Sequence, residues 1–425
     1  MKLLRLLLVI AVLVPLVSAE PLPFRQAVEL AVKRSAVLSA ADRQRAYESF
    51  RAAQRMYIPQ VIVGSGLAKT FGFPMSIEGS APSVVNVNSM GYLINFAQND
   101  LVRAARTEWN ATTFSSDDRR QQTILDTALT YTQLDRLASA LNLLHQQQEE
   151  AQRAEQITTD RVQAGVESQV DLTRAQLGSA RVRLATVQVQ GSLDLLRSQL
   201  SQLTGVPAQS IETVTESIPQ LPEISQTEDL PAKAVSSNPA VKLALAAADA
   251  KQFRARSEHR QLYPAVDFVG QYGLFAKFNN FDVFFRSFER NNATIGVAIR
   301  FPVFNMAQRA RAAAADAEAV QARHQVDDAK NKVSNETLKL QRDVAQLAAE
   351  RDVARLEYQL ARSDVDAVQA KIQAGTATLR DEANARLAES QKYSAYLDAT
   401  YQLEHTQMQL LRSTGELEQW ALAQK

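Results

Sequence analysis

The sequence predicts a mainly α-helical protein with membrane β-strands, built from two copies of one unit of helix, strand, strand, long helix and helix. Three observations predict this fold class. The chain resembles itself at a nearly constant offset, each copy holds two segments that alternate apolar and polar residues, and the long helices repeat apolar positions every seven residues.

Internal duplication is the first signal. Residues 161–205 align with 371–415 without a gap, at an offset of 210. Upstream, the run Arg103-Ala104-Ala105 recurs at 311–313, an offset of 208. A small drift over so long a distance indicates two copies of one unit.

The copies set the expected domain boundaries. We expect a first structural repeat at 20–206, and a second repeat with a C-terminal segment at 232–425. Between them, 207–231 contains four prolines and predicts a linker. We interpret it as an irregular surface connection without a function.

The N-terminus predicts a secretory signal peptide at 1–19. Lys2 and Arg5 precede an apolar run that ends in Val17-Ser18-Ala19. The alternative is a transmembrane anchor, but the run has about a dozen residues and a helical span needs about 20. No later segment reaches about 18 consecutive apolar residues, so a mature chain that enters a membrane would do so as β-strands.

Two alternating segments in each copy predict strands, near 58–70, 84–96, 264–277 and 292–301. In the third, one face holds Val266, Phe268, Tyr272 and Leu274, and the other holds Asp267, Gln271 and Lys277. In the fourth, Ile295, Val297, Ile299 and Phe301 alternate with Thr294, Gly296, Ala298 and Arg300. The pattern suits strands between lipid and an aqueous lumen, although a soluble sheet would also show it. An interface girdle or loop is indicated by Phe275, Phe278, Phe281, Phe284, Phe285 and Phe288.

The long helices carry sustained coiled-coil seams. The first seam is Leu172, Ala175, Ser179, Val182, Thr186, Val189, Leu193, Leu196, Leu200 and Leu203. The second is Val333, Thr337, Leu340, Val344, Leu347, Arg351, Ala354, Tyr358, Ala361, Val365, Val368 and Ile372. A helix from about Asn99 to Gln163 would be about 100 Å long, so it must lie in a coiled coil, a tube wall or a spectrin-like array.

The predicted strands leave open edges, which cannot exist in hydrocarbon. Closure therefore requires further copies of the chain. Two copies would give about eight strands, whose bore side chains fill, and three would give about twelve, with room for a lumen. We therefore expect a homotrimer that closes one β-barrel.

The plan as a whole resembles the outer-membrane efflux protein family typified by TolC. The motifs that carry the resemblance are Gln163-Ala164-Gly165 with Asp171, Gln373-Ala374-Gly375, the closing Thr204-Gly205 and Thr414-Gly415, and the strand-to-helix junction Phe301-Pro302-Val303-Phe304. One departure is Ile94, which stands where the second copy has Pro302 and leaves the strand register near 84–96 open.

The resemblance implies a trimeric β-barrel in the cell outer membrane, continued by an α-helical coiled-coil tunnel in the periplasm. It implies docking to a periplasmic adaptor (membrane fusion) protein and to an inner-membrane pump or exporter. The chain would be the passive exit duct of a multi-component efflux or type I secretion system. The nature of the cargo is not encoded in these motifs.

The resemblance also implies two sites. The family's periplasmic gate is narrowed by acidic residues just beyond the second-copy turn, where Asp381 matches and Asn384 stands in place of the second acid. The alternative for Asp381 is a helix cap. The adaptor would dock on the turns Gln163-Ala164-Gly165 and Gln373-Ala374-Gly375, although ending a helix would by itself explain each glycine.

Composition argues against chemistry at this chain. It has no cysteine, a net charge of +1, and four histidines without a second ligand at helical metal spacing. It lacks the phosphate-binding pattern of an ATPase, so energy must come from a partner. We therefore expect no catalytic, metal or cofactor site and no nucleic acid partner. The alternative function is a secreted or periplasmic coiled-coil scaffold, which would explain the seams but not the strand pairs.

Overall fold

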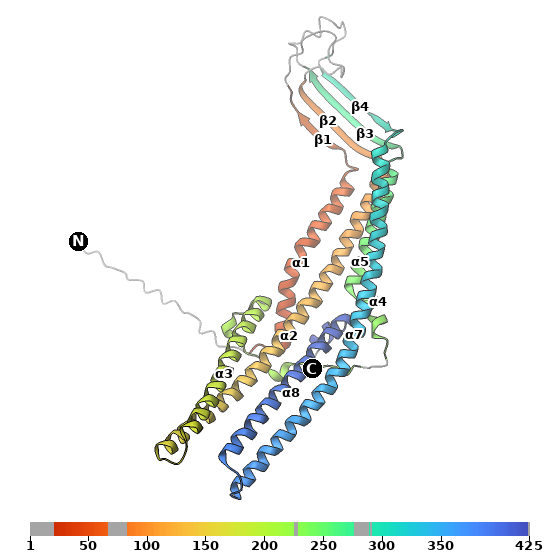
Figure 1. Ribbon diagram of the computed structural model, residues 1–425. Helices are drawn as coiled ribbons and strands as arrows, with labels where there is room; N and C mark the ends of the chain where they lie inside the picture. The colour runs from red at the N-terminus through yellow and green to blue at the C-terminus, as the bar shows by residue number, and fades with distance from the viewer. Residues whose placement is uncertain (1–20, 67–82, 225–227, 276–288, 290, 424–425) are drawn as a thin grey trace, which may run out of the picture. The chain divides into compact units, whose positions relative to one another are not determined.

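A computed structural model describes residues 21–66, 83–224, 228–275, 289 and 291–423. The predicted signal peptide at 1–19 and the phenylalanines from Phe278 to Phe288 lie outside the described residues. Figure 1 labels the strands and all the helices named here except α9. The elements are α1 (Phe24–Arg55), β1 (Gln60–Gly64), β2 (Ser83–Ile94), α2 (Phe96–Gln163), α3 (Gln169–Thr204), α4 (Leu230–Ser237), α5 (Pro239–Arg260), β3 (Ala265–Phe275), β4 (Asn291–Arg300), α7 (Met306–Gln373), α8 (Leu379–Thr414) and α9 (Leu417–Ala421), with short 3-10 turns at Ala208–Ser210 and Thr215–Ser217.

The chain divides into two compact units. The first unit comprises Met1–Val37, Arg119–Ala234 and Asn335–Lys425, and it contains two helical hairpins, α2 with α3 and α7 with α8. The second unit comprises Leu38–Asp118 and Val235–Ser334, and it contains the strands. The helices α1, α2, α4 and α7 contribute residues to both units.

The internal repeat predicted from the sequence is confirmed. The helices α2 and α7 each contain 68 residues, and α3 and α8 each contain 36. The helix α2 starts at Phe96 and α7 at Met306, 210 positions later, and their ends Gln163 and Gln373 are separated by the same 210 positions. The predicted offset of 208 near the start of the long helix is therefore wrong, because an alanine-rich run matches its copy at more than one offset.

The predicted seams coincide with the inward faces of the helices. None of the first-seam positions from Leu172 to Leu203 is exposed, and Leu193, Leu196 and Leu200 are buried. None of the second-seam positions is exposed either, and Val344 and Val365 are buried. Heptad spacing therefore identified the packed face of each long helix.

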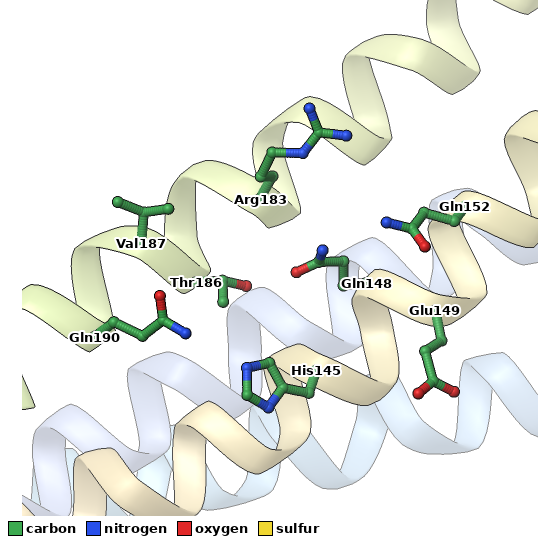
Figure 2. A pocket seen from close by; sticks show the side chains of 8 residues that line it. All are labelled: His145, Gln148, Glu149, Gln152, Arg183, Thr186, Val187 and Gln190. Carbon is green, nitrogen blue, oxygen red and sulfur yellow. The ribbon is translucent and has the colours of Figure 1, made fainter.

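A polar groove separates the helices of the first hairpin in its middle part. It is lined by His145, Gln148, Glu149 and Gln152 from α2, and by Arg183, Thr186, Val187 and Gln190 from α3. Figure 2 shows His145 and Gln148 on α2 facing Thr186 and Gln190 on α3. The residues at the contact are short or hydrophilic, so they leave the space open.

The second hairpin fills the equivalent place with tyrosines. At 210 positions beyond Gln148, Arg183 and Thr186 stand Tyr358, Tyr393 and Tyr396. The Tyr358 ring lies 5.0 Å from the Tyr393 ring and stacks at 6.3 Å on the Tyr396 ring, with 6° between the planes. Aromatic pairs at such distances stabilise a contact beyond the area that they bury.

The two hairpins are joined through α2 and α8. Arg136 Nη1 on α2 donates to Asp398 Oδ1 on α8 at 2.9 Å, and the Arg136 guanidinium lies 4.5 Å from the centre of the Tyr401 ring. Gln147 Nε2 donates to Ser390 Oγ at 3.2 Å further along. The helices α3 and α7 are therefore the outer helices of this four-helix layer (Figure 1).

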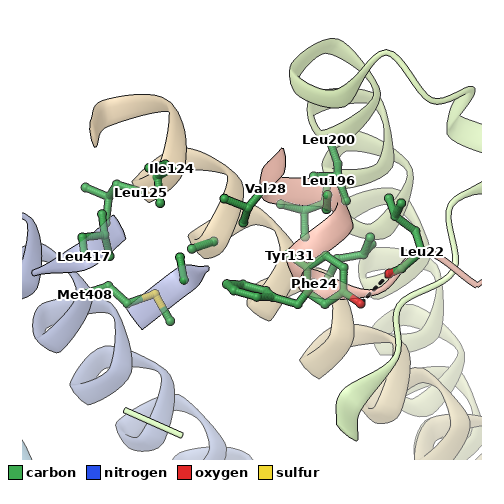
Figure 3. Packing of buried hydrophobic residues seen from close by; sticks show 14 of the residues in the cluster. Leu22, Phe24, Val28, Ile124, Leu125, Tyr131, Leu196, Leu200, Met408 and Leu417 are labelled. Carbon is green, nitrogen blue, oxygen red and sulfur yellow. Dashed lines mark hydrogen bonds between the residues drawn. The ribbon is translucent and has the colours of Figure 1, made fainter. Parts of the chain in front are cut away.

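The main core of the first unit lies where the start of α1, the ends of α3 and α8, and α9 meet the middle of α2. Figure 3 shows Phe24, Tyr131, Leu196 and Met408 among its members. Phe24 meets Tyr131 and Trp420 edge to face, with ring centres 5.4 and 5.5 Å apart. The core therefore gathers residues from both ends of the chain.

The connection between the copies belongs to this core. Ile211 is 1% exposed, and the Tyr131 hydroxyl accepts from the Val214 N–H at 2.8 Å while it donates to the Leu22 carbonyl at 2.7 Å. Trp420 Nε1 donates to the Gln220 carbonyl at 3.1 Å. The connection is irregular, as expected, and most of its described residues are exposed or half-buried, but Ile211 anchors it in the core.

Candidate functional site

The sheet of the second unit is antiparallel throughout, in the order β1-β2-β3-β4. All four predicted strands are present, but the first is shorter than expected, since it ends at Gly64, and the second ends before Phe96, where α2 begins. Residues 67–70 of the first prediction and 276–277 of the third lie outside the described residues. Gln60 pairs with Met90 and Ala265 pairs with Arg300. Since Met90 and Arg300 are 210 positions apart, Pro302 corresponds to Tyr92, not to Ile94 as the sequence alignment had it.

One face of the sheet is apolar. The register places Val266 opposite Ile299 and Phe268 opposite Val297, as the predicted alternation requires. The same face, called the apolar face below, also holds Val61, Val63, Val85, Val87, Ile94, Tyr272, Leu274 and Ile295. On β4, Ile295 is 80% exposed and Val297 is 60% exposed. A row of exposed β-branched side chains is the surface that a membrane strand presents to lipid.

The other face, called the polar face below, holds Gln60, Asn86, Asn88, Gln271, Asn292 and Thr294. It also carries Asp267 and Arg300, whose Oδ2 and Nη2 atoms lie 2.6 Å apart. Amide, hydroxyl and charged groups on one side of a strand suit contact with water.

The predicted strand-to-helix junction lies in the segment between β4 and α7. Phe301 is 65% exposed and Phe304 is 82% exposed. Pro302 has no N–H to donate to a neighbouring strand, so the ladder ends at Arg300.

Two residues at each junction were missed by the sequence analysis. Asn95 Oδ1 accepts from the Gln98 N–H at 3.0 Å, and Asn305 Oδ1 accepts from the Gln308 N–H at 2.9 Å. Each glutamine then donates from Nε2 to the last turns of the preceding helix, Gln98 to the Ala53 carbonyl at 2.7 Å and Gln308 to the Glu258 carbonyl at 2.9 Å. The repeated pattern Asn-x-Ala-Gln at 95–98 and 305–308 is the signal that would have found them.

The predicted docking turns close both hairpins with the same geometry. Gly165 has φ 75° and Gly375 has φ 72°. The Gly165 N–H bonds to the Val162 carbonyl at 3.0 Å and the Val166 N–H to the Arg161 carbonyl at 2.9 Å, and the second turn repeats this pattern. It is a Schellman motif, which requires a left-handed residue at the glycine. The neighbours Gln163, Ala164, Gln373 and Ala374 are exposed.

Asp381 takes part in a capping box at the start of α8. Its Oδ2 accepts from the Thr378 N–H at 2.9 Å, and its own N–H donates to Thr378 Oγ1 at 3.3 Å. The Thr378 N–H bond and the Thr378 hydroxyl hold the pKa of Asp381 below its ordinary value. In the first copy, Ser168 caps α3 in the same way, and its hydroxyl lowers the pKa of Asp171. Asn384 is exposed one turn further along α8.

The described residues hold no group of three or more histidine, cysteine, aspartate or glutamate side chains arranged to bind a metal ion. His259 pairs through Nε2 with Asp316 Oδ2 at 2.8 Å. No helix within the described ranges is both long and apolar enough to cross a bilayer.

Solved structures of outer membrane channels have this fold. VceC from Vibrio cholerae has 18% sequence identity and a TM-score of 0.73, with 92% of this chain and 96% of that chain covered. CmeC from Campylobacter jejuni has 16% identity and a TM-score of 0.75, with 95% and 87% covered. MtrE from Neisseria gonorrhoeae has 14% identity and a TM-score of 0.72, with 93% and 90% covered. No curated protein matches the chain in sequence.

The chain therefore shares the fold of outer membrane channel subunits with long helical hairpins. The family model for outer membrane efflux proteins matches residues 30–206 and 230–416, which is most of the chain. The chain belongs to the outer membrane efflux protein family. It is an exit duct in the outer membrane that extends into the periplasm, and it functions with partner proteins.

Proposed function

We propose that the chain is the passive exit duct of a multi-component efflux or type I secretion system, driven by an inner-membrane pump or exporter and performing no chemistry of its own. The observation that carries this proposal is the apolar face, which runs across all four strands and is backed by a polar face. Such a two-sided sheet separates lipid from water. Family membership supports the same function.

The duct would be a homotrimer. The strands β1 and β4 lie at the sheet edges, where their outer backbone groups have no partner strand among the described residues. On the outer helix α3, Val170, Leu177 and Leu184 recur every seven residues and are 57%, 49% and 58% exposed. On the outer helix α7, Val353, Leu356 and Leu360 form a similar exposed row. Exposed heptad rows on both outer helices suit contact between neighbouring copies.

The experiment is cell fractionation followed by mass measurement of the detergent-extracted protein. We expect the chain in the outer membrane fraction, with the mass of three copies. A charge in the α3 row, Leu177→Glu, should reduce trimer yield, whereas Ser198→Glu on the same helix should not. A stable monomer, or a chain recovered in the soluble periplasmic fraction, would exclude the trimeric duct.

The adaptor would dock on the turns that hold Gly165 and Gly375. Both turns are exposed, and each presents a small residue and main-chain groups to a partner. Replacing both Ala164 and Ala374 with glutamate should abolish export while trimers form normally, because these two side chains are exposed and take no part in the backbone hydrogen bonds that close the turns. Ala154→Glu, on an exposed part of α2 away from the turn, is the control. Full export by the double variant would exclude docking here.

Asp381 and Asn384 would lie at the periplasmic gate. Three copies of Asp381 near the axis would attract cations. The first copy supplies a matched control, because Asp171 has the same capping role. We expect Asp381→Ala, and not Asp171→Ala, to lower cation selectivity and block by multivalent cations in bilayer recordings. If the two variants change cation selectivity and block equally, both aspartates act only as helix caps and the gate assignment of Asp381 is wrong.

Residues 1–19 would be removed on export, so the mature chain would begin at Glu20. The repeats would then span 20–206 and 232–425, joined by 207–231. N-terminal sequencing of the outer membrane protein tests the cleavage site, and a chain that still begins at Met1 would contradict it.

A further inference from the structure

The described strands contain one pair of charged residues. Asp267 on β3 and Arg300 on β4 are the only charged residues between the printed bounds of β1 to β4. Asp267 is opposite Ala298 and Arg300 is opposite Ala265, so the two side chains are diagonal neighbours on the polar face. Arg300 Nη2 donates to Asp267 Oδ2 at 2.6 Å.

The two partners differ in their access to water. The Asp267 side chain is 4% exposed, whereas the Arg300 side chain is 63% exposed. Tyr92 faces Asp267 from the other neighbouring strand. The pair is neutral as a whole, but the charge nearest to the solvent is the guanidinium.

The first copy builds the same strand pair without these charges. The register makes Ile62 the counterpart of Asp267 and Met90 the counterpart of Arg300. The hairpin of β1 and β2 therefore forms with two apolar side chains in these places. Burying a carboxylate costs free energy that its ion partner only partly offsets. The fold thus does not require the pair, and its presence in one copy needs another explanation.

We propose that Arg300 contributes to ion selectivity in the barrel: three copies form a ring of guanidinium groups on the lumen wall, which attracts anionic solutes and so opposes the cation preference of the Asp381 ring at the periplasmic end. Asp267 is the positioning residue that holds each guanidinium in place. This inference rests on the proposed trimeric barrel, whose polar face lines the lumen. The field of such a ring reaches about 10 Å at 0.1 M salt and about 3 Å at 1 M, so the preference is strongest in dilute salt.

The test replaces the pair with the residues of the first copy, in the double variant Asp267→Ile/Arg300→Met. Both residues are changed because Arg300→Met alone would leave a buried carboxylate without its ion partner. The purified trimer is placed in a planar bilayer under a KCl gradient and the reversal potential is measured. We expect the chloride-to-potassium permeability ratio to fall at least about twofold near 0.1 M and to match the wild type near 1 M. Asp267→Asn should raise the ratio, because it removes the neutralising charge, and Arg300→Lys should preserve it.

Three further outcomes would overturn either the selectivity role of Arg300 or the proposed function. Reversal potentials of the double variant equal to those of the wild type in dilute salt would overturn the selectivity role. A double variant that forms no trimer would also overturn it, since the pair would then be required for folding. A wild-type chain that forms trimers but no channel would overturn the proposed function, and with it this inference.

Discussion

The hairpins α2/α3 and α7/α8 agree in length, turn and cap, and they differ in what lies between their helices. Gln148 and Thr186 border an open groove in the first hairpin, while Tyr358 and Tyr396 stack in the second. The lesson is that helix ends and heptad seams define the backbone of this repeat. Side chains midway along the contact between the two helices of a hairpin can then differ between the copies without any change in helix length.

The core ends of the hairpins differ as well. Leu200 on α3 belongs to the large cluster that includes Phe24 and Tyr131, whereas its counterpart Leu410 on α8 belongs to a cluster of four buried residues. Both leucines are almost inaccessible, at 0% and 1% exposed. The same position thus supports cores of unequal size.

The largest expected effect comes from shortening these leucines. We expect Leu200→Ala to lower the free energy of unfolding by about 4 kcal/mol and Leu410→Ala by about 2 to 3 kcal/mol, because a cavity in the smaller cluster collapses more readily. Urea titration of the detergent-solubilised protein measures both. Ser198→Ala, at an exposed position of α3, should stay within about 0.5 kcal/mol of the wild type. A larger loss of unfolding free energy in Leu410→Ala than in Leu200→Ala would contradict the expectation that the larger cluster contributes more to stability.

The tyrosine cluster should have the next largest effect. Tyr358→Ala is expected to lower the free energy of unfolding by about 1 to 2 kcal/mol, since a half-buried ring loses contacts with two others. Gln148→Ala, at the equivalent place in the first hairpin, should change it by less than about 0.5 kcal/mol. The same urea titration compares them, and equal losses would mean that the groove is as well packed as the cluster.

The turns should respond alike in both hairpins. A Cβ atom at Gly165 or Gly375 would meet nothing within 4 Å, so alanine is penalised only for the left-handed backbone, by about 1 kcal/mol. Gly178→Ala, inside α3 and equally free of neighbours, should instead stabilise the protein by about 1 kcal/mol. The thermal unfolding midpoint should therefore fall when Gly165 or Gly375 is replaced with alanine, and rise in Gly178→Ala. A midpoint lowered by Gly178→Ala would contradict the conformational account.

The smallest effect concerns pH and the two caps. The folded-state pKa values of Asp171 and Asp381 are below the ordinary 3.8, so the contribution of each cap is complete above pH 3.8 and is lost as pH falls through the lowered value. We expect the helical circular dichroism signal to fall below pH 3.8 in the wild type, and to fall less in Asp381→Asn. The hydroxyl and the backbone of Ser168 both lower the pKa of Asp171, so Asp171→Asn should flatten the profile in the same way. An unchanged profile in either variant would contradict the role of that cap.

Periodicity made much of the fold predictable. The seam from Leu172 to Leu203 was identified residue by residue because a seven-residue repeat reports which side of a helix is packed. The alternation of Ile295, Val297 and Ile299 likewise identified one face of β4 before its partner strand was known. The turns at Gly165 and Gly375 were found because glycine accommodates a left-handed residue.

Features that depend on distant partners were not predictable in this way. The Asn95 and Asn305 caps are a different case, because they are local and were overlooked only since an alanine-rich run suggested the wrong offset. The burial of Ile211 depends on Tyr131 and Leu22, which are far away in sequence. The pairing of Asp267 with Arg300 requires the register of β3 with β4, which composition does not contain.

The meeting of Phe24 with Trp420 has a consequence for the order of folding. A core that contains both ends of the chain has high contact order, so it forms only after the last helix, α9, has been made and exported. The first copy, although synthesised in full by Thr204, remains without its final packing partners until then. During that interval its apolar seam is open to chaperones and proteases, and the rate at which the C-terminus arrives sets the length of the exposure.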